Sequence, residues 1–157
     1  MSHALTRRQW LLAASATVCA AGGGTAAAAT LPPALSLPEE LARALKQQQP
    51  LVVMVSLDGC PFCKVARDHY LAPLHREENL PIVQIDMRGK RMVKNFKGQM
   101  VTHDAMVRAW GIKITPTVLF LGRGGQEVAE RLVGGYLPDF YGAYLDERLL
   151  QSRAALK

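Results

Sequence analysis

Short apolar runs alternate with amphipathic stretches along most of this chain. Residues 51–55 are apolar at every position and rich in β-branched side chains, which is typical of a strand buried on both faces of a sheet. Before this run, apolar residues recur at helical spacing, and Pro38 stands at the first helical position, where a helix tolerates proline. The same reasoning predicts strands over 51–55, 82–86, 117–121 and 127–133, and helices over 38–49, 60–71, 102–110 and 138–151.

The order of these elements predicts the fold class. Strands that alternate with helices indicate a layered α/β domain, and the closing hairpin over 117–133 indicates a central mixed β-sheet flanked by helices. Within this plan, Pro73 is expected to end or kink the second helix. The polar, basic stretch 87–101 is interpreted as a surface excursion, and Trp110 and Phe120 are expected to lie in the core. A chain of 157 residues has room for one such domain.

Composition and charge exclude several classes of protein. Hydrophobic residues make up 49% of the chain and charged residues 20%, so the sequence is neither disordered nor collagen-like, and three cysteines are too few for a disulfide-dense mini-protein. With 19 Lys and Arg against 13 Asp and Glu, the net charge is +6. The basic residues are interspersed with acids, and the densest cluster, 88–97, is short. We therefore expect a solvated basic surface and no nucleic-acid partner.

The first 29 residues have the pattern of an export signal. Arg7 and Arg8 precede an apolar run over 10–21, and small residues close to Ala29 offer cleavage sites. The paired arginines resemble the twin-arginine export motif. The alternative, an uncleaved membrane anchor, is disfavoured because the apolar run is shorter than the ~20 residues that span a bilayer. We expect cleavage near Ala29, a mature domain over 30–157 in the periplasm, and no stable membrane insertion after cleavage.

The candidate chemistry lies in Cys60-Pro61-Phe62-Cys63, directly after the first predicted strand. Two cysteines at this spacing can form a disulfide on the first turn of a helix. Cys60 would lie at the helix N-terminus, where the helix dipole and free N–H groups stabilise a thiolate. A thiolate attacks disulfides, and Cys63 would then resolve the mixed disulfide. The pattern predicts a redox-active pair in which Cys60 is the nucleophile, Cys63 is the resolving cysteine, and Phe62 presents an apolar surface to the substrate.

The two cysteines could serve three other purposes. A structural disulfide would use the same atoms, but so small a loop constrains the unfolded chain very little. A zinc site needs four ligands, and the residues that could complete one are His69, His75 and His103. A module that holds Cu(I) between the two thiolates is the alternative function from another class. We favour the redox interpretation, and we expect no metal and no separate cofactor because the cysteines themselves carry the electrons.

The sequence resembles the thioredoxin superfamily over residues 51–150. The resemblance rests on Cys60 and Cys63 between a buried strand and a helix, and on the Ile-Thr-Pro-Thr segment that contains Thr115 and Pro116 before a hairpin. It is greatest to exported bacterial thioredoxin-like proteins of the SoxW kind. It implies a thioredoxin-like fold and thiol:disulfide oxidoreductase activity on protein substrates. In the family, the proline matching Pro116 follows a cis peptide bond and faces the disulfide, and the backbone matching Thr115 pairs with an extended substrate strand.

Two departures from the family pattern bear on the direction of the reaction. The buried acid that thioredoxins carry six residues before the first cysteine is Met54 here, and the tryptophan that usually precedes that cysteine is Gly59. Asp58 is the nearest acid in sequence, and we expect it to be solvated. We expect a reductase that a membrane redox partner keeps reduced. An oxidase, recharged by a quinone-linked partner, is the other possible direction.

Overall fold

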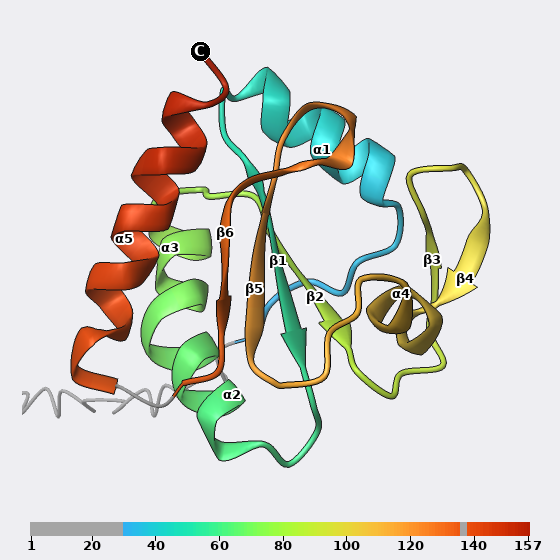
Figure 1. The fold of residues 1–157 in the computed structure, drawn as a ribbon, viewed down its shortest axis with the longest axis horizontal. Coiled ribbons are helices and arrows are strands. Elements are labelled where there is room, and N and C mark those ends of the chain that lie inside the picture. The colour runs from blue at the N-terminus through green and yellow to red at the C-terminus, as the bar shows by residue number, and fades with distance from the viewer. Residues whose placement is uncertain (1–29, 136–137) are drawn as a thin grey trace, which may run out of the picture.

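The computed structural model describes residues 30–135 and 138–157, which contain a four-stranded mixed sheet (Figure 1). Its strand order is β2-β1-β5-β6, with β1 parallel to β2, and with β5 antiparallel to both β1 and β6. The strands are β1 (Leu51–Ser56), β2 (Ile82–Asp86), β5 (Thr117–Leu121) and β6 (Glu127–Val133). These bounds confirm the four predicted strands and the mixed sheet. The predicted export signal and its cleavage site near Ala29 lie outside the described residues.

Helices cover both faces of the sheet (Figure 1). α1 and α4 pack on one face, whereas α2, the helical segments that follow it, and α5 pack on the other. The helical segments are α1 (Leu37–Lys46), α2 (Pro61–Val65), η1 (Ala66–Leu71), α3 (Ala72–Glu77), α4 (His103–Ala109), η2 (Arg123–Gly125) and α5 (Pro138–Ala154). Within the described part of the chain, no helix has the length and the apolar character needed to cross a membrane.

β1 lies inside the sheet and is buried along its whole length. Val53 and Val55 belong to the core cluster on the α1 face, and Met54 belongs to the cluster on the α5 face. Because side chains alternate between the two faces of a strand, both faces here demand apolar residues, as predicted. Phe120 of β5 is fully buried, which confirms its place in the core. Trp110 is only partly buried, because it follows α4 at the rim of the α1-face cluster.

The helix that carries the second cysteine does not end at Pro73. α2, η1 and α3 follow one another without a break from Pro61 to Glu77. η1 is π-helical, and at its end the Ala72 N–H donates to the carbonyl oxygen of Arg67, five residues earlier. Proline has no N–H and its ring clashes with a regular helical turn, so the wider π turn just before it accommodates Pro73. The predicted C-terminal end of this helix is therefore wrong.

The stretch 87–101 was predicted as a surface excursion without regular structure, but it contains strand residues. It contains β3 (Met92–Lys94), which pairs antiparallel with β4 (Met100–Thr102). Val93 of β3 is fully buried in the α1-face cluster. Each of the two strands is only three residues long and stands among charged residues, so the alternation needed to predict them is absent.

The segment before α1 covers the edge of β2. Ala34 N–H donates to the carbonyl oxygen of Gln84 at 2.9 Å, and Gln84 N–H donates to that of Pro32 at 2.8 Å. The ring of His103, on α4, joins the same two segments: its Nε2 lies 2.9 Å from the carbonyl oxygen of Ala34, and its Nδ1 accepts from Asp86 N–H at 3.1 Å. This arrangement satisfies backbone groups that an open sheet edge would leave unpaired.

The turn between β5 and β6 depends on Gly125. Its φ is +72°, and a Cβ atom there would lie 2.6 Å from the ring of Phe96. Gly124 has a φ of +71° but nothing within 4 Å of the same position. We expect Gly125→Ala to lower the free energy of unfolding by about 1–3 kcal/mol more than Gly124→Ala, because only the first variant overpacks the contact with Phe96. Chemical denaturation measures the difference, and equal losses would show that this contact is not tight.

Candidate active site

β1, the loop after it and α2 position the cysteine pair. β1 ends at Ser56, Gly59 turns the chain with a φ of +72°, and Cys60 occupies the N-cap position of α2. The Sγ atom of Cys60 accepts a hydrogen bond from Cys63 N–H at 3.1 Å, so it caps one of the N–H groups that a helix start leaves free. Pro61 follows at the first helical position, where a missing N–H costs nothing.

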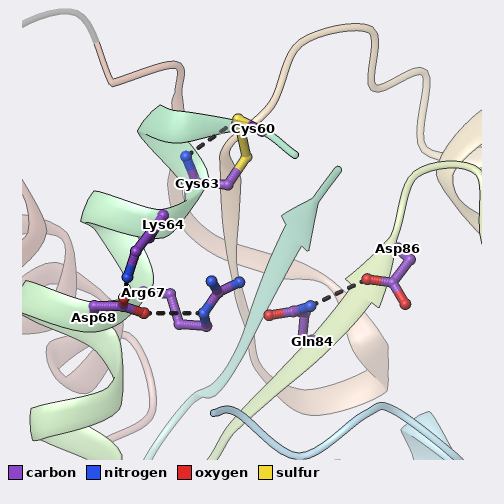
Figure 2. Close-up of polar contacts among 7 residues, drawn as sticks. All are labelled: Cys60, Cys63, Lys64, Arg67, Asp68, Gln84 and Asp86. Atoms are coloured by element: carbon purple, nitrogen blue, oxygen red, sulfur yellow. Dashed lines mark hydrogen bonds and ion pairs between the residues drawn. A yellow bond between two sulfur atoms is a disulfide. The ribbon is translucent and has the colours of Figure 1, made fainter. Parts of the chain in front are cut away.

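Cys60 and Cys63 form a disulfide, with their Cα atoms 5.2 Å apart (Figure 2). The two sulfur-bearing residues differ in access to solvent. Cys63 is 1% exposed and belongs to the core cluster on the α5 face, whereas Cys60 is partly exposed. A protein substrate can therefore reach Cys60 directly, while the surrounding core screens Cys63.

The loop before β5 lies beside the disulfide. Its peptide bond between Thr115 and Pro116 is cis. The Oγ1 atom of Thr115 lies 3.8 Å from Cys60 Sγ, and the carbonyl oxygen of Thr115 lies 4.0 Å from the same sulfur. Pro116 is buried, and its carbonyl oxygen accepts from Gly134 N–H at 2.7 Å. The fold thus brings the two residues of this loop that the resemblance pointed to against the cysteine pair.

Phe62 and Gly135 extend the same surface. A Cβ atom at Gly135 would lie 3.3 Å from Cβ of Phe62 and 3.7 Å from Cγ of Pro116, so the chain after β6 passes close to both. Phe62 is 49% exposed and Ile114, which precedes Thr115, is 43% exposed. Apolar surface is therefore available next to Cys60. Sequence reasoning did not single out Gly135, although two glycines in a row after a strand indicate a close approach of backbone to another group.

The acid that thioredoxins bury near the second cysteine is absent at its usual position. Met54 is fully buried on the α5 face of the sheet, and its neighbour on β2 is Gln84. Asp58 is exposed, and its Oδ1 accepts from Gly59 N–H at 3.0 Å, which confirms that it is solvated. A thioether cannot accept a proton at neutral pH, so a proton that leaves Cys63 has to go to a group other than Met54.

The three histidines that could complete a zinc site do not lie together with the cysteine pair as a group of metal ligands. His69 is exposed, and His75 Nδ1 lies 2.9 Å from the carbonyl oxygen of Leu80. His103 is fully buried and both of its ring nitrogens contact backbone groups. Among residues 30–135 and 138–157, no three His, Cys, Asp or Glu side chains come together as a metal-binding group.

A small charge network lies one helical turn below the pair (Figure 2). Asp68 contacts Lys64 Nζ, and its Oδ1 accepts from Arg67 Nε at 3.1 Å. Burial of Asp68 opposes its ionisation, but the hydrogen bond and charge of Lys64, together with those of Arg67, outweigh burial and lower the pKa of Asp68. A lowered carboxyl pKa stabilises the fold at neutral pH, and this contribution is lost as the pH falls through that pKa.

A family model described as the thioredoxin-like domain matches residues 37–148. The chain belongs to the thioredoxin superfamily. A domain of this superfamily with a Cys-x-x-Cys pair in a disulfide at the start of a helix is a thiol:disulfide oxidoreductase, and protein thiols and disulfides are its substrates in general.

Solved structures of thioredoxins share the fold. Mitochondrial thioredoxin 3 of Saccharomyces cerevisiae, in its oxidised form, is 17% identical with a TM-score of 0.51, over 76% of this chain and 93% of that one. Trxlp of Edwardsiella tarda is 22% identical with a TM-score of 0.50, over 74% and 98%. Thioredoxin f of spinach chloroplasts is 19% identical with a TM-score of 0.50, over 78% and 96%. No curated protein matches the chain.

One feature of this thioredoxin-like site escaped sequence reasoning. A pocket of about 690 Å³ opens beside Cys60, and its wall includes Ser56, Arg67, Asp86 and Arg88. These residues come from the end of β1, from η1, from the end of β2 and from the loop after β2. No local pattern connects four such segments, so only the folded chain shows the pocket.

Proposed function

We propose that this protein is an exported reductase of protein disulfides that works through Cys60 and Cys63. The observation that carries the proposal is the difference in access within one disulfide. Cys60 is partly exposed beside Thr115, whereas Cys63 is 1% exposed behind it. A disulfide with a purely structural role has no need of one accessible sulfur at a helix start, next to an exposed apolar surface.

Cys60 is the nucleophile when the pair is reduced. Its thiolate attacks one sulfur of a substrate disulfide, forms a mixed disulfide and releases the other substrate sulfur as a thiolate. The N–H of Cys63, 3.1 Å from Cys60 Sγ, stabilises the attacking thiolate. Cys63 then gives up its proton and attacks Cys60 Sγ, which closes the protein disulfide and releases the second substrate thiolate. Two electrons pass to the substrate, so each cycle requires two electrons from a donor.

Thr115, Pro116 and Phe62 are proposed to hold the substrate. The backbone of Thr115 is placed to pair with an extended chain in the manner of an added strand, since it lies beside the sulfur that would be attacked. Pro116 fixes this loop, and the exposed ring of Phe62 offers apolar contact to side chains around the substrate disulfide.

Phe62→Ala is expected to slow the reduction of a protein disulfide about three- to tenfold relative to that of a small disulfide, because only the larger substrate covers the ring. The ratio of the two rate constants is the measurement. Leu150→Ala is the matched control, since it removes an apolar side chain that is 67% exposed on α5. Equal losses with both substrates in Phe62→Ala would contradict a substrate contact.

The reducing direction and the proposed location outside the cytoplasm together require a source of electrons. A reductase outside the cytoplasm needs an electron supply, and we propose a membrane redox partner as its donor. The paired Arg7 and Arg8 and the apolar run that follows them support export. Fractionation of expressing cells is expected to find a periplasmic chain that begins near residue 30, and an uncut chain in the cytoplasm would contradict export.

Turnover of insulin disulfides with dithiothreitol as electron source tests the function. The protein is expected to accelerate the reaction, and Cys60→Ser is expected to lose the acceleration. The alternative, a carrier of Cu(I), predicts stoichiometric copper in the purified protein that is lost in the same variant, together with no acceleration. Activity without copper would support the oxidoreductase.

A further inference from the structure

A pocket of about 690 Å³ lies beside the disulfide, near the end of β2. Ser56, at the end of β1, contributes only a small side chain to its wall. The backbone of Gly89 packs closely against the end of β2, because a Cβ atom on Gly89 would lie 2.9 Å from Cβ of Asp86. The volume of the pocket is that of a small-molecule site, and Cys60 is part of the pocket wall. We call it the β2-side pocket, and its charged wall residues are Asp58, Lys64, Arg67, Asp86 and Arg88.

Two of the three cations in this wall, Arg67 and Arg88, have side-chain N–H donors without a partner among the described residues. Lys64 and the Nε atom of Arg67 contact Asp68, which lies outside the pocket wall. The two terminal nitrogens of Arg67 make no hydrogen bond to any residue that the structure describes, and Figure 2 shows its guanidinium group extending from η1 toward β2. Arg88 is exposed and forms no ion pair with any residue among 30–135 and 138–157.

The two carboxylates in the wall each accept one hydrogen bond from an uncharged amide. Asp58 is exposed and its Oδ1 accepts from Gly59 N–H at 3.0 Å. Asp86 Oδ1 accepts from Gln84 Nε2 at 3.1 Å. Neither carboxylate forms an ion pair with Arg67 or Arg88 among the described residues, so the guanidinium groups of these two arginines keep N–H donors for an anion in the pocket that Cys60 also lines.

We propose that the β2-side pocket binds a carboxylate of the substrate while Cys60 attacks, so that the protein prefers disulfides with a carboxylate a few bonds from the sulfur. The inference rests on the proposed function, because it requires Cys60 to be the attacking residue. Arg67 and Arg88 determine specificity in this account. They bind the carboxylate and take no part in the electron transfer.

The reaction balances with the substrate disulfide, R–S–S–R, as the oxidant. The Cys60 thiolate attacks one sulfur, so the mixed disulfide Cys60–S–S–R forms and one RS⁻ leaves. Cys63 loses its proton to solvent and attacks Cys60 Sγ, so the protein disulfide forms and the second RS⁻ leaves. The carboxylate remains on R throughout, and two electrons move from the protein dithiol to the substrate disulfide, which is reduced to two thiolates.

A charge series of small disulfides tests the pocket. The reduced full-length protein is mixed at low ionic strength with dithiodipropionate, which is anionic, with bis(2-hydroxyethyl) disulfide, which is neutral, and with cystamine, which is cationic. The ratio of the anionic to the neutral rate constant is expected to fall about three- to tenfold in Arg67→Gln and in Arg88→Gln, and to recover in Arg67→Lys. Lys46→Gln removes the same charge from an exposed position on α1 and is expected to leave the ratio unchanged.

The ratio separates the pocket from the reactivity of Cys60, since a change in the thiolate alters both rate constants alike. Raising the salt concentration is expected to reduce the anionic preference of the unmodified protein, because salt screens charges. An unchanged ratio in both arginine variants would overturn the pocket proposal and leave the oxidoreductase function standing. Failure of the reduced protein to react with any of the three disulfides would contradict the proposed function itself, and the pocket proposal with it.

A second arm identifies the source of the carboxylate. Two peptide disulfides that differ only in Glu or Gln next to the cysteine are compared with the small disulfides. A preference for the Glu peptide that Arg67→Gln removes would assign the carboxylate to a protein substrate. A preference confined to dithiodipropionate would assign it to a small acidic disulfide.

Discussion

Cys60→Ser is expected to abolish turnover of protein disulfides, lowering the rate by about 10³-fold or more, whereas Cys63→Ser is expected to stop after the first step. The reason is the geometry of the pair. Cys60 is the accessible cysteine and lies beside Thr115, while Cys63 is 1% exposed and can act only on a sulfur already attached to Cys60. Without Cys63 the first attack still occurs, but the mixed disulfide persists.

Non-reducing gels and intact-mass measurement read out this difference. Cys63→Ser, incubated with a protein disulfide, is expected to accumulate a covalent complex through Cys60, and Cys60→Ser is expected to accumulate none. Circular dichroism of both variants shows whether the fold is retained. A complex formed through Cys63 in the Cys60→Ser variant would reverse the two assigned roles.

His103→Ala is expected to have the largest effect on stability, lowering the free energy of unfolding by about 3–5 kcal/mol. The side chain is fully buried, and its ring contacts the carbonyl oxygen of Ala34 and the N–H of Asp86. The variant leaves both backbone groups without a partner, opens a cavity, and loosens the segment that covers the edge of β2. Chemical denaturation at neutral pH is the measurement.

His69→Ala is the matched control for this prediction. The same side chain is removed from an exposed position on η1, so a change within about 0.5 kcal/mol is expected. If His103→Ala has the same free energy of unfolding as His69→Ala, the ring of His103 does not hold α4, β2 and the segment before α1 together.

Three strands of the main sheet, β1, β2 and β5, could be predicted because their burial leaves a local pattern. β1 lies between two layers of helices, which favours apolar residues along it, and the run 51–55 before Ser56 shows this. The π-helical segment could not be predicted, since Pro73 alone does not say whether a helix stops or widens. β3 and β4 were missed because a three-residue strand is too short to show alternation.

The same distinction applies to the site. Cys60 and Cys63 stand together in the sequence, and the local pattern of strand, pair and helix start already indicates their chemistry. Thr115 and Pro116 were reached only through family resemblance, because they lie far along the chain and meet the pair in the fold. The β2-side pocket had no signal at all, since its wall combines residues of segments that are far apart along the chain.

The reduction potential of the Cys60–Cys63 pair tests the central claim most directly. The purified protein is equilibrated with dithiothreitol or glutathione buffers, and its free thiols are trapped and counted. A reductase is expected to cycle with a midpoint near that of thioredoxin, about −270 mV. A midpoint of about −120 mV would contradict the reductase and indicate an oxidant, and a pair that does not cycle at all would contradict the redox function.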